Sequence, residues 1–249
     1  MRYFHFIFLL SFFTLFSQNN LEISYIINYN TEIPNKKTGD LLIDLKEQKS
    51  VFYISKTNLK PGATLLDNEI KVIQKGVERY IIIDKIKDSL ISKDIINNNI
   101  YLIKESVPQF KWDVQYKKTK KIGKYICNKA TTQFRGRKYT AWYSMEFPIR
   151  FGPWKFNGLP GIIIEIYDET FRYHWIATKI KSSQEHLILP IADKKLKSIS
   201  LKEYVDVRYN QQLEISSSRL GRETRTELIK VPRSGIEIKF EWEEETKKD

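Results

Sequence analysis

The stretch GIIIEIY, at residues 161–167, is apolar at nearly every position. A strand of this kind is typically central in a sheet, with both of its faces covered. The segment 171–180 follows after the short polar link 168–170, and the two segments together predict a β-hairpin. The chain is therefore expected to build its core around a β-sheet.

A second hairpin is predicted on the N-terminal side of this stretch. Residues 125–134 and 139–145 read as strands and flank a basic turn in which Gly136 can adopt a positive φ. Further strand-like segments recur at a spacing of roughly ten residues, which is typical of an antiparallel meander. They lie at 21–29, 41–45, 51–55, 80–83, 89–91 and 100–103.

One helix is predicted near the C-terminus, over 201–213. Ser200 and Glu203 form the sequence pattern of a capping box, and apolar residues then recur every four positions. We expect the helix to end near 216–218 and an exposed loop to cover 219–233. Alternating apolar and charged residues at 236–242 predict a closing strand.

These elements predict a mainly β fold, a curved antiparallel sheet or open barrel with the 201–213 helix on its concave face. That arrangement is similar to periplasmic lipoprotein carriers, which hold an acyl chain between sheet and helix. The similarity concerns the fold and does not establish a function.

The N-terminus has the three parts of a secretory signal peptide. Arg2 supplies the positive charge, residues 4–16 form an apolar run, and Ser17 precedes a polar stretch. We expect cleavage after Ser17 and a single β-rich domain over 18–249. The apolar run is shorter than the ~20 residues of a membrane-spanning helix, and no later stretch approaches that length. The prediction is an exported protein of the periplasm or cell envelope, soluble or peripheral.

The formal net charge of +12 comes with three basic clusters. They lie at 117–121, 135–138 and 194–197. In an exported protein such clusters do not indicate nucleic acid as a partner. Anionic envelope lipids or polysaccharides are alternatives, and solvated loops between strands are the simplest interpretation. The expected partners are therefore lipid or an envelope protein.

The segment 147–161 has an unusual composition, with three prolines and three glycines among aromatic residues. The prolines exclude a helix and a central strand. The aromatic content predicts a rigid, packed loop, in which Pro160 and Gly161 form a type II turn with Gly161 at positive φ.

This loop holds the candidate binding residues. Its aromatic side chains and Trp142 can form one wall of an apolar cleft, or they can complete the core at the end of the sheet. The candidates for ligand or partner contact are Trp142, Phe151, Trp154, Phe156, Asn157 and Leu159.

The hexapeptide at 158–163 resembles the signature of the GLPGLI family of exported proteins in Gram-negative bacteria. It reads Gly158, Leu159, Pro160, Gly161, Ile162 and Ile163, and departs from the family's name at Ile162, where Leu is expected. Other similar stretches lie at 111–112, 122–125, 129–132, 139–142, 151–156, 166–168 and 235–237. The resemblance implies a cell-envelope compartment. It implies no mechanism, because the family has no established activity.

Residues with catalytic or metal-binding chemistry are few. Beyond the signal peptide there are two histidines, His174 and His186, and the only cysteine of the chain is Cys127. No pair has the spacing of a zinc site, and no nucleophile elbow or phosphate-binding glycine loop is present. We predict no metal, no cofactor and no catalytic residue. The alternative is that Cys127 and His174 form a nucleophile–base pair. The simpler interpretation is that Cys127 is a buried core residue and His174 an ordinary strand histidine.

Three functions remain open at this level. The first is a non-enzymatic envelope protein that binds an apolar ligand, a lipid or a partner protein, and a deep apolar cavity would favour it. The second is an envelope hydrolase whose site is not located, which a buried polar group of residues with perturbed pKa values would favour. The third is a scaffold without a small ligand, which a filled interior would favour.

Overall fold

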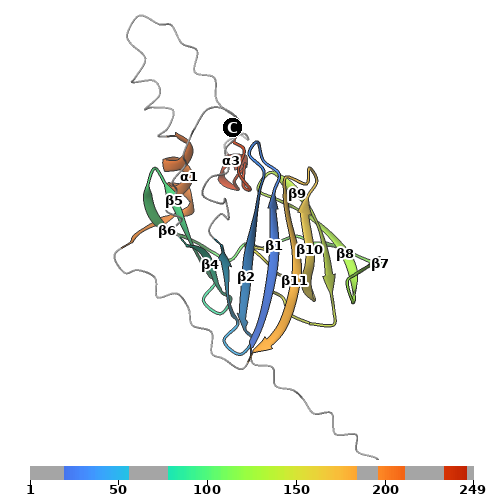
Figure 1. Ribbon diagram of the computed structural model, residues 1–249. Coiled ribbons are helices and arrows are strands. Elements are labelled where there is room, and N and C mark those ends of the chain that lie inside the picture. The colour runs from blue at the N-terminus through green and yellow to red at the C-terminus, as the bar shows by residue number, and fades with distance from the viewer. Residues whose placement is uncertain (1–19, 56–77, 184–195, 211–232, 246–249) are drawn as a thin grey trace, which may run out of the picture.

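The structure is a computed structural model that describes residues 20–55, 78–183, 196–210 and 233–245. Its strands form one sheet in the order β12-β6-β5-β4-β3-β2-β1-β11-β10-β9-β8-β7. Their bounds are β1 Asn20–Tyr29, β2 Asn35–Asp44, β3 Lys49–Ile54, β4 Arg79–Asp84, β5 Ser89–Ile96, β6 Asn99–Glu105, β7 Asp113–Ile122, β8 Tyr125–Phe134, β9 Arg137–Ser144, β10 Ile162–Asp168, β11 Tyr173–Ser183 and β12 Lys197–Ser200. The sheet is curved, with β6 and β7 on opposite sides of the molecule (Figure 1).

The topology joins two meanders through the N-terminal strand. β1 to β6 follow one another in the sheet, β7 to β11 form the second series, and β11 returns to pair with β1 along the whole of β1. Neighbours are antiparallel except β12, which lies parallel to β6. The prediction of a mainly β, curved, open and essentially antiparallel sheet is confirmed.

One face of the sheet, here called the inner face, carries most of the core. Alternate strand residues that point to it are almost completely buried; examples are Ile23, Ile27, Leu41, Phe52 and Ile83. Burying each such side chain contributes about 1.5–3 kcal/mol. β10 lies between β9 and β11 and is buried at most positions, as its apolar sequence predicted.

The loop before β10 packs into this core, as its composition predicted. The Phe156 ring meets the Tyr139, Trp154 and Trp175 rings edge to face, with centroids 4.9, 5.0 and 5.5 Å away. Such aromatic pairs stabilise by about 0.5–1.5 kcal/mol beyond the area they bury. The loop therefore covers the inner face over β9 and β11, the two neighbours of β10.

The predicted capping box forms and starts helix α1, Leu201–Val205. The Glu203 backbone N–H donates to Ser200 Oγ at 3.2 Å, and the Ser200 N–H donates to Glu203 Oε2 at 2.7 Å. A π-helical turn, η1, continues over Asp206–Asn210. The predicted positions beyond 210, including Leu213, lie outside the described residues. Leu201 and Val205 are buried in a cluster with Ile103 of β6, so α1 covers that end of the inner face.

The predicted closing strand at 236–242 is wrong. The segment 233–240 is irregular, and a short helix, α3, follows at Trp242–Glu245. The N–H groups of Ile238 and Lys239 both donate to the Arg135 carbonyl, at 3.0 and 3.2 Å, so they form no strand ladder. The Phe240 N–H donates to Glu243 Oε2 at 2.9 Å, which is the geometry of a helix cap.

The type II turn predicted at Pro160 and Gly161 is also wrong, because Gly161 does not have a positive φ. Glycine is needed there for another reason: a Cβ on Gly161 would lie 2.2 Å from the Ser144 carbonyl oxygen of β9. In this loop, positive φ occurs at Gly158 (95°) and Trp154 (55°). The expected positive φ at Gly136 is present, at 86°.

We predict that Gly161→Ala destabilises the protein by about 3 kcal/mol or more, because the added methyl meets backbone that cannot move aside. Gly123→Ala is the matched control. Gly123 has a φ of 57° but open space around it, so alanine there should cost about 1 kcal/mol through backbone strain alone. Urea unfolding of both variants measures the difference. Equal losses would show that close approach to β9 does not constrain residue 161.

Candidate functional site

The structure brings together the five candidate residues of the loop. Phe151, Trp154, Phe156 and Leu159 are buried in one core cluster. Asn157 is buried beside them, and its side-chain amide donates to the carbonyls of Pro108 and Lys155, each at 3.1 Å. These residues complete the core, which is the second of the two readings that the sequence allowed.

Trp142 lies apart from the other candidates. It alternates along β9 with buried Tyr139, Ala141 and Tyr143, so it points to the opposite, outer face. There the Lys120 ammonium lies 4.9 Å from the centre of the Trp142 ring. Trp142 therefore does not share a wall with the aromatic residues of the loop.

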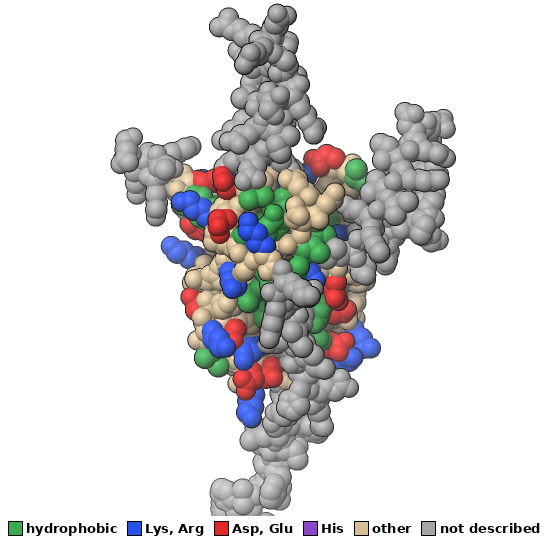
Figure 2. Space-filling view, turned by 90° about the vertical axis from the view of Figure 1, so that its left-hand side faces the viewer, with side chains coloured by type: hydrophobic (Ala, Val, Ile, Leu, Met, Phe, Trp, Pro, Cys, Tyr) green, Lys and Arg blue, Asp and Glu red, His purple; other side chains and the backbone are tan. Residues whose placement is uncertain are grey.

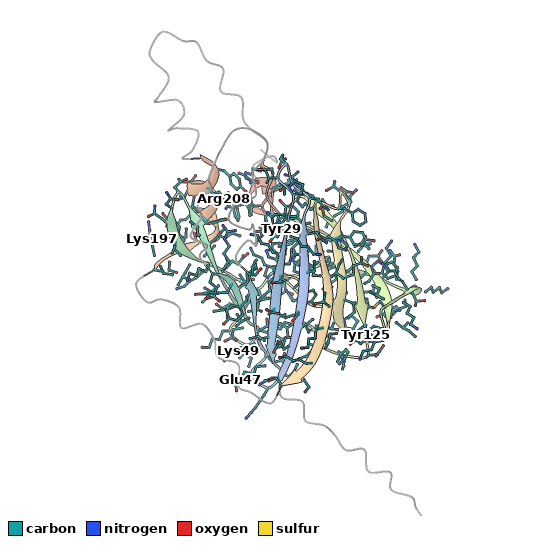
Figure 3. The ribbon with its side chains drawn as sticks, in the orientation of Figure 1. Tyr29, Glu47, Lys49, Tyr125, Lys197 and Arg208 are labelled. Carbon is teal, nitrogen blue, oxygen red and sulfur yellow. The ribbon has the colours of Figure 1, made fainter. Side chains whose placement is uncertain are left out.

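Trp154 has a second role besides core packing. It stacks on Trp175, with ring centroids 6.2 Å apart, and another part of it lines a cavity of about 240 Å³. The cavity lies between the inner face, the turn η1 and the segment 235–240. Figure 3 shows Tyr29 and Arg208, which both line it, near the same end of the sheet, away from Glu47 and Lys49 in the β2–β3 turn region.

The lining of the cavity is largely aromatic and aliphatic. Its aromatic members come from strands, loop, helix and C-terminal segment, and they are Tyr29, Tyr80, Trp154, Tyr173, Tyr204, Tyr209 and Phe240. Aliphatic residues from β3, β4 and β6 join them. Six charged residues also contribute to the lining: Arg79, Lys93, Asp94, Lys155, Arg208 and Glu237. Apolar walls with placed polar groups are usual in small-molecule sites.

A polar network stands at one end of the cavity, around Asp94 of β5. Arg79 Nε lies 3.0 Å from Asp94 Oδ1, and Arg208 Nη1 lies 3.3 Å from Oδ2. The Tyr204 hydroxyl donates to Oδ2 at 2.6 Å and accepts from Arg208 Nη1 at 2.7 Å. Burial, followed by the charge of Asp94, raises the pKa of Tyr204 well above its ordinary value, so its phenol stays neutral. The network links η1 to the sheet.

Tyr29 faces the same region from β1. Burial raises its pKa to about 12, although the positive charge of Arg79 acts in the opposite direction. The Lys37 ammonium lies 5.2 Å from the centre of the Tyr29 ring. This end of the cavity therefore combines neutral phenols with cationic side chains.

A buried ion cluster closes the other end. Lys155 Nζ lies 2.6 Å from Glu105 Oε1 and 2.9 Å from Glu237 Oε1. Arg135 pairs with Glu237 as well, and its Nη2 lies 2.7 Å from Glu105 Oε2. Burial opposes ionisation of Glu237, but Lys155 and Arg135 outweigh it and hold its pKa below the usual range. Arg135 is thus buried, although its basic cluster was predicted to be solvated.

The charged surface elsewhere is mixed. Lys117, Lys118, Lys120 and Lys121 lie exposed on β7, at an edge of the sheet, where lysines discourage pairing with other strands. Figure 2 looks onto the side that carries β5 and β6 and shows charges of both signs around exposed hydrophobic side chains. That face carries no large patch of a single sign.

A shallower depression of about 630 Å³ lies beside Ser234, and three arginines line it. Each arginine has an acidic partner: Arg137 with Asp168, Arg172 with Glu32, and Arg233 with Glu243. The depression therefore carries little surplus positive charge.

The pairing of Cys127 with His174 is not seen. His174 Nε2 lies 3.0 Å from Glu165 Oε1 on the outer face, and Lys120 holds the other carboxylate oxygen at 2.6 Å. Burial raises the pKa of the Cys127 thiol to about 11, so it is protonated at neutral pH and is not an activated nucleophile. Within the described ranges, no three His, Cys, Asp or Glu residues are grouped as metal ligands.

A part of the chain matches a known family model. Residues 134–165 match the model described as a protein of unknown function (Porph_ging). This stretch runs from the end of β8 into β10 and includes the packed loop. No curated protein sequence matches the chain significantly.

Two crystal structures of PNGF-II, in space groups P21 and C2, are similar to the fold, each with 15% identity and a TM-score of 0.51. The match covers 77% and 76% of this chain but 33% and 32% of PNGF-II, so the chain spans about a third of that protein's length. At this identity the likeness concerns the fold alone.

A LolA superfamily protein from Nitrosomonas europaea is similar over 69% of this chain and 89% of its own, with 10% identity and a TM-score of 0.31. That score is too low to carry a conclusion. In the described part of the chain, no helix combines the length and hydropathy that crossing a bilayer requires.

We predict that Lys155→Met destabilises the protein by about 3–5 kcal/mol, because Glu105 and Glu237 then share a single buried cation. Glu241→Gln is the control. The Glu241 side chain is 61% exposed while pairing with Arg135, so its loss should cost less than about 1 kcal/mol. Denaturant midpoints measure both effects. A Lys155→Met loss as small as that of the control would show that the cluster does not hold the loop to the C-terminal segment.

Proposed function

We propose that this protein binds a small, largely apolar ligand in the cavity between the inner face, η1 and the segment 235–240, and that it is not an enzyme. The observation that carries the proposal is the cavity itself, lined by aromatic and aliphatic side chains from strands, helix and loop. A concave, partly open cavity with aromatic and aliphatic walls and a limited set of polar groups is the usual form of a small-molecule site.

The volume limits the size of the occupant. A water molecule takes about 30 Å³ in the liquid, so 240 Å³ encloses about eight to ten non-hydrogen atoms of a ligand. The cavity is partly open to solvent, so the rest of a larger ligand can project from it. This corresponds to a short acyl segment or a single ring with a side chain. A lipid, or a small amphiphile from the envelope, is the proposed class.

The two other functions have weaker support. Asp94, Tyr204 and Arg208 form a partly buried polar group, but their contacts with one another hold η1 in place. The loop around Phe156 does fill much of the inner face, as a scaffold would require, yet it leaves the cavity beside Trp154. Binding of a ligand accounts for both the packing and the cavity.

The binding test uses the neutral fluorescent probe N-phenyl-1-naphthylamine. Ser92 lies on β5 between Ile81 and Ile103 and lines the cavity, so Ser92→Phe should fill part of the space. We expect wild-type protein to enhance the fluorescence of the probe, and Ser92→Phe to weaken probe binding at least tenfold.

Thr140→Phe is the matched control, because Thr140 lies on β9 with its side chain on the outer face. It should leave the affinity unchanged, and thermal melts confirm that both variants fold. Equal binding by wild type and Ser92→Phe would place the probe elsewhere and remove the basis for the proposal.

We also propose that the chain is an exported cell-envelope protein of the GLPGLI type. The apolar run at 4–16 and the hexapeptide at 158–163 support this, and the match at 134–165 includes the hexapeptide. We expect the mature protein to begin at Gln18 or within two residues of it. N-terminal sequencing of protein from the envelope fraction measures this, and a chain that still begins at Met1 would contradict export by cleavage.

A further inference from the structure

The two ends of the cavity differ in charge. At the end near Trp154, the buried cations Lys155 and Arg135 are matched by Glu105 and Glu237. At the other end, cationic side chains of β2, β4 and η1 gather around one carboxylate, Asp94. Positive charge is therefore in surplus at that end only.

Lys37 is the clearest sign of the surplus. Among the described residues, its ammonium has no carboxylate at ion-pair distance, and its contact is the face of the Tyr29 ring. Burial lowers the pKa of Lys37, and the positive charge of Arg79 lowers it further, against the smaller opposite effect of Asp94. An anion placed in this region would relieve the repulsion between these cations.

The arginines are placed to receive such an anion. Arg79 uses Nε for Asp94, and Arg208 bonds Asp94, Tyr204 and Tyr209, whereas each guanidinium carries five N–H donors. Their side chains are 41% and 37% exposed, so they stand at the rim while the aromatic lining lies deeper. Arginine pairs bind planar carboxylates and phosphates with directed hydrogen bonds.

We propose that the cavity selects an amphiphile with one anionic group, a carboxylate or a phosphate, bound by Arg79 and Arg208, with its apolar part against Tyr29, Tyr204 and Trp154. This inference rests on the proposed function and adds the chemical class of the ligand. Lys37 contributes long-range attraction to the anionic group.

The test compares four ligands of equal chain length by displacement of N-phenyl-1-naphthylamine: octanoate, octyl phosphate, octanol and octylammonium. At low salt we expect the tighter of the two anions to bind at least tenfold more tightly than octanol, and octylammonium to bind weakest. Affinity for the anions should fall as NaCl is added, because partly exposed charges are screened. A preference for octanoate would indicate a free fatty acid, and a preference for octyl phosphate would indicate a phosphate headgroup.

Variants separate ligand binding from structural support. Arg79→Gln should weaken anion binding about tenfold and leave octanol unchanged. Because this change also removes an ion pair of Asp94, Lys37→Gln provides a second variant that loses no ion pair, with an expected loss of about threefold for anions alone. Arg172→Gln is the control, since Arg172 pairs with Glu32 in the separate depression.

The outcomes distinguish this inference from the proposed function. If octanol binds as tightly as both anions, or if both Arg79→Gln and Lys37→Gln leave the anion preference intact, the charge inference is overturned while apolar binding stands. If none of the four ligands displaces the probe, the proposed function fails and the inference fails with it.

Discussion

The packing of Trp154 and Phe156 onto Trp175 and Tyr139 is the interaction on which the rest of this structure depends. A curved sheet of twelve strands cannot cover its own inner face, and within the described ranges helix α1 covers only the β6 end. The loop before β10 supplies the missing layer. Gly161 allows it to pass against β9, and the backbone bridge between Phe151 and Asn157 closes it into a compact unit. The cavity is the space left between this loop and η1.

The buried ion cluster connects this loop to the C-terminal segment. Lys155 is next to Trp154 in the chain, and its partner Glu237 belongs to the segment that covers the cavity. Arg135 and Glu105 bring the β8–β9 turn and the end of β6 into the same contact. Because an unpaired charge is costly in this environment, the four side chains fix the relative positions of four distant parts of the sequence. The cavity therefore has walls that are held in place before a ligand arrives.

Much of the fold could be predicted from the sequence, because strand periodicity and the capping box are local signals. The all-apolar stretch at 161–167 correctly indicated a buried strand, and Ser200 with Glu203 correctly placed the helix start. The prediction of a closing strand was wrong because the alternation of apolar and charged residues at 236–242 also fits an irregular segment. In that segment two N–H groups donate to the Arg135 carbonyl and not to a neighbouring strand. The prediction of a type II turn at Gly161 was wrong because glycine is required there by close contact with the Ser144 backbone. No local sequence pattern reveals such a tertiary contact.

The site was harder to predict than the fold. Trp154 was found through the composition of its loop, but the polar end of the cavity was missed. Arg79 and Asp94 belong to the consecutive strands β4 and β5, but no local pattern shows that Arg208 of η1 packs against them. Trp142 was misplaced for the opposite reason. It was grouped with the aromatic residues of the loop, whereas its alternation with Tyr139 and Tyr143 along β9 places it on the outer face.

The most direct measurement of the central claim is a crystal structure of the protein grown with octanoate. The account predicts continuous density between Tyr29, Tyr204 and Trp154, with the carboxylate within about 3 Å of guanidinium nitrogens of Arg79 and Arg208. An empty cavity in crystals whose solution holds saturating octanoate, or density on the outer face beside Glu165 and His174, would contradict it.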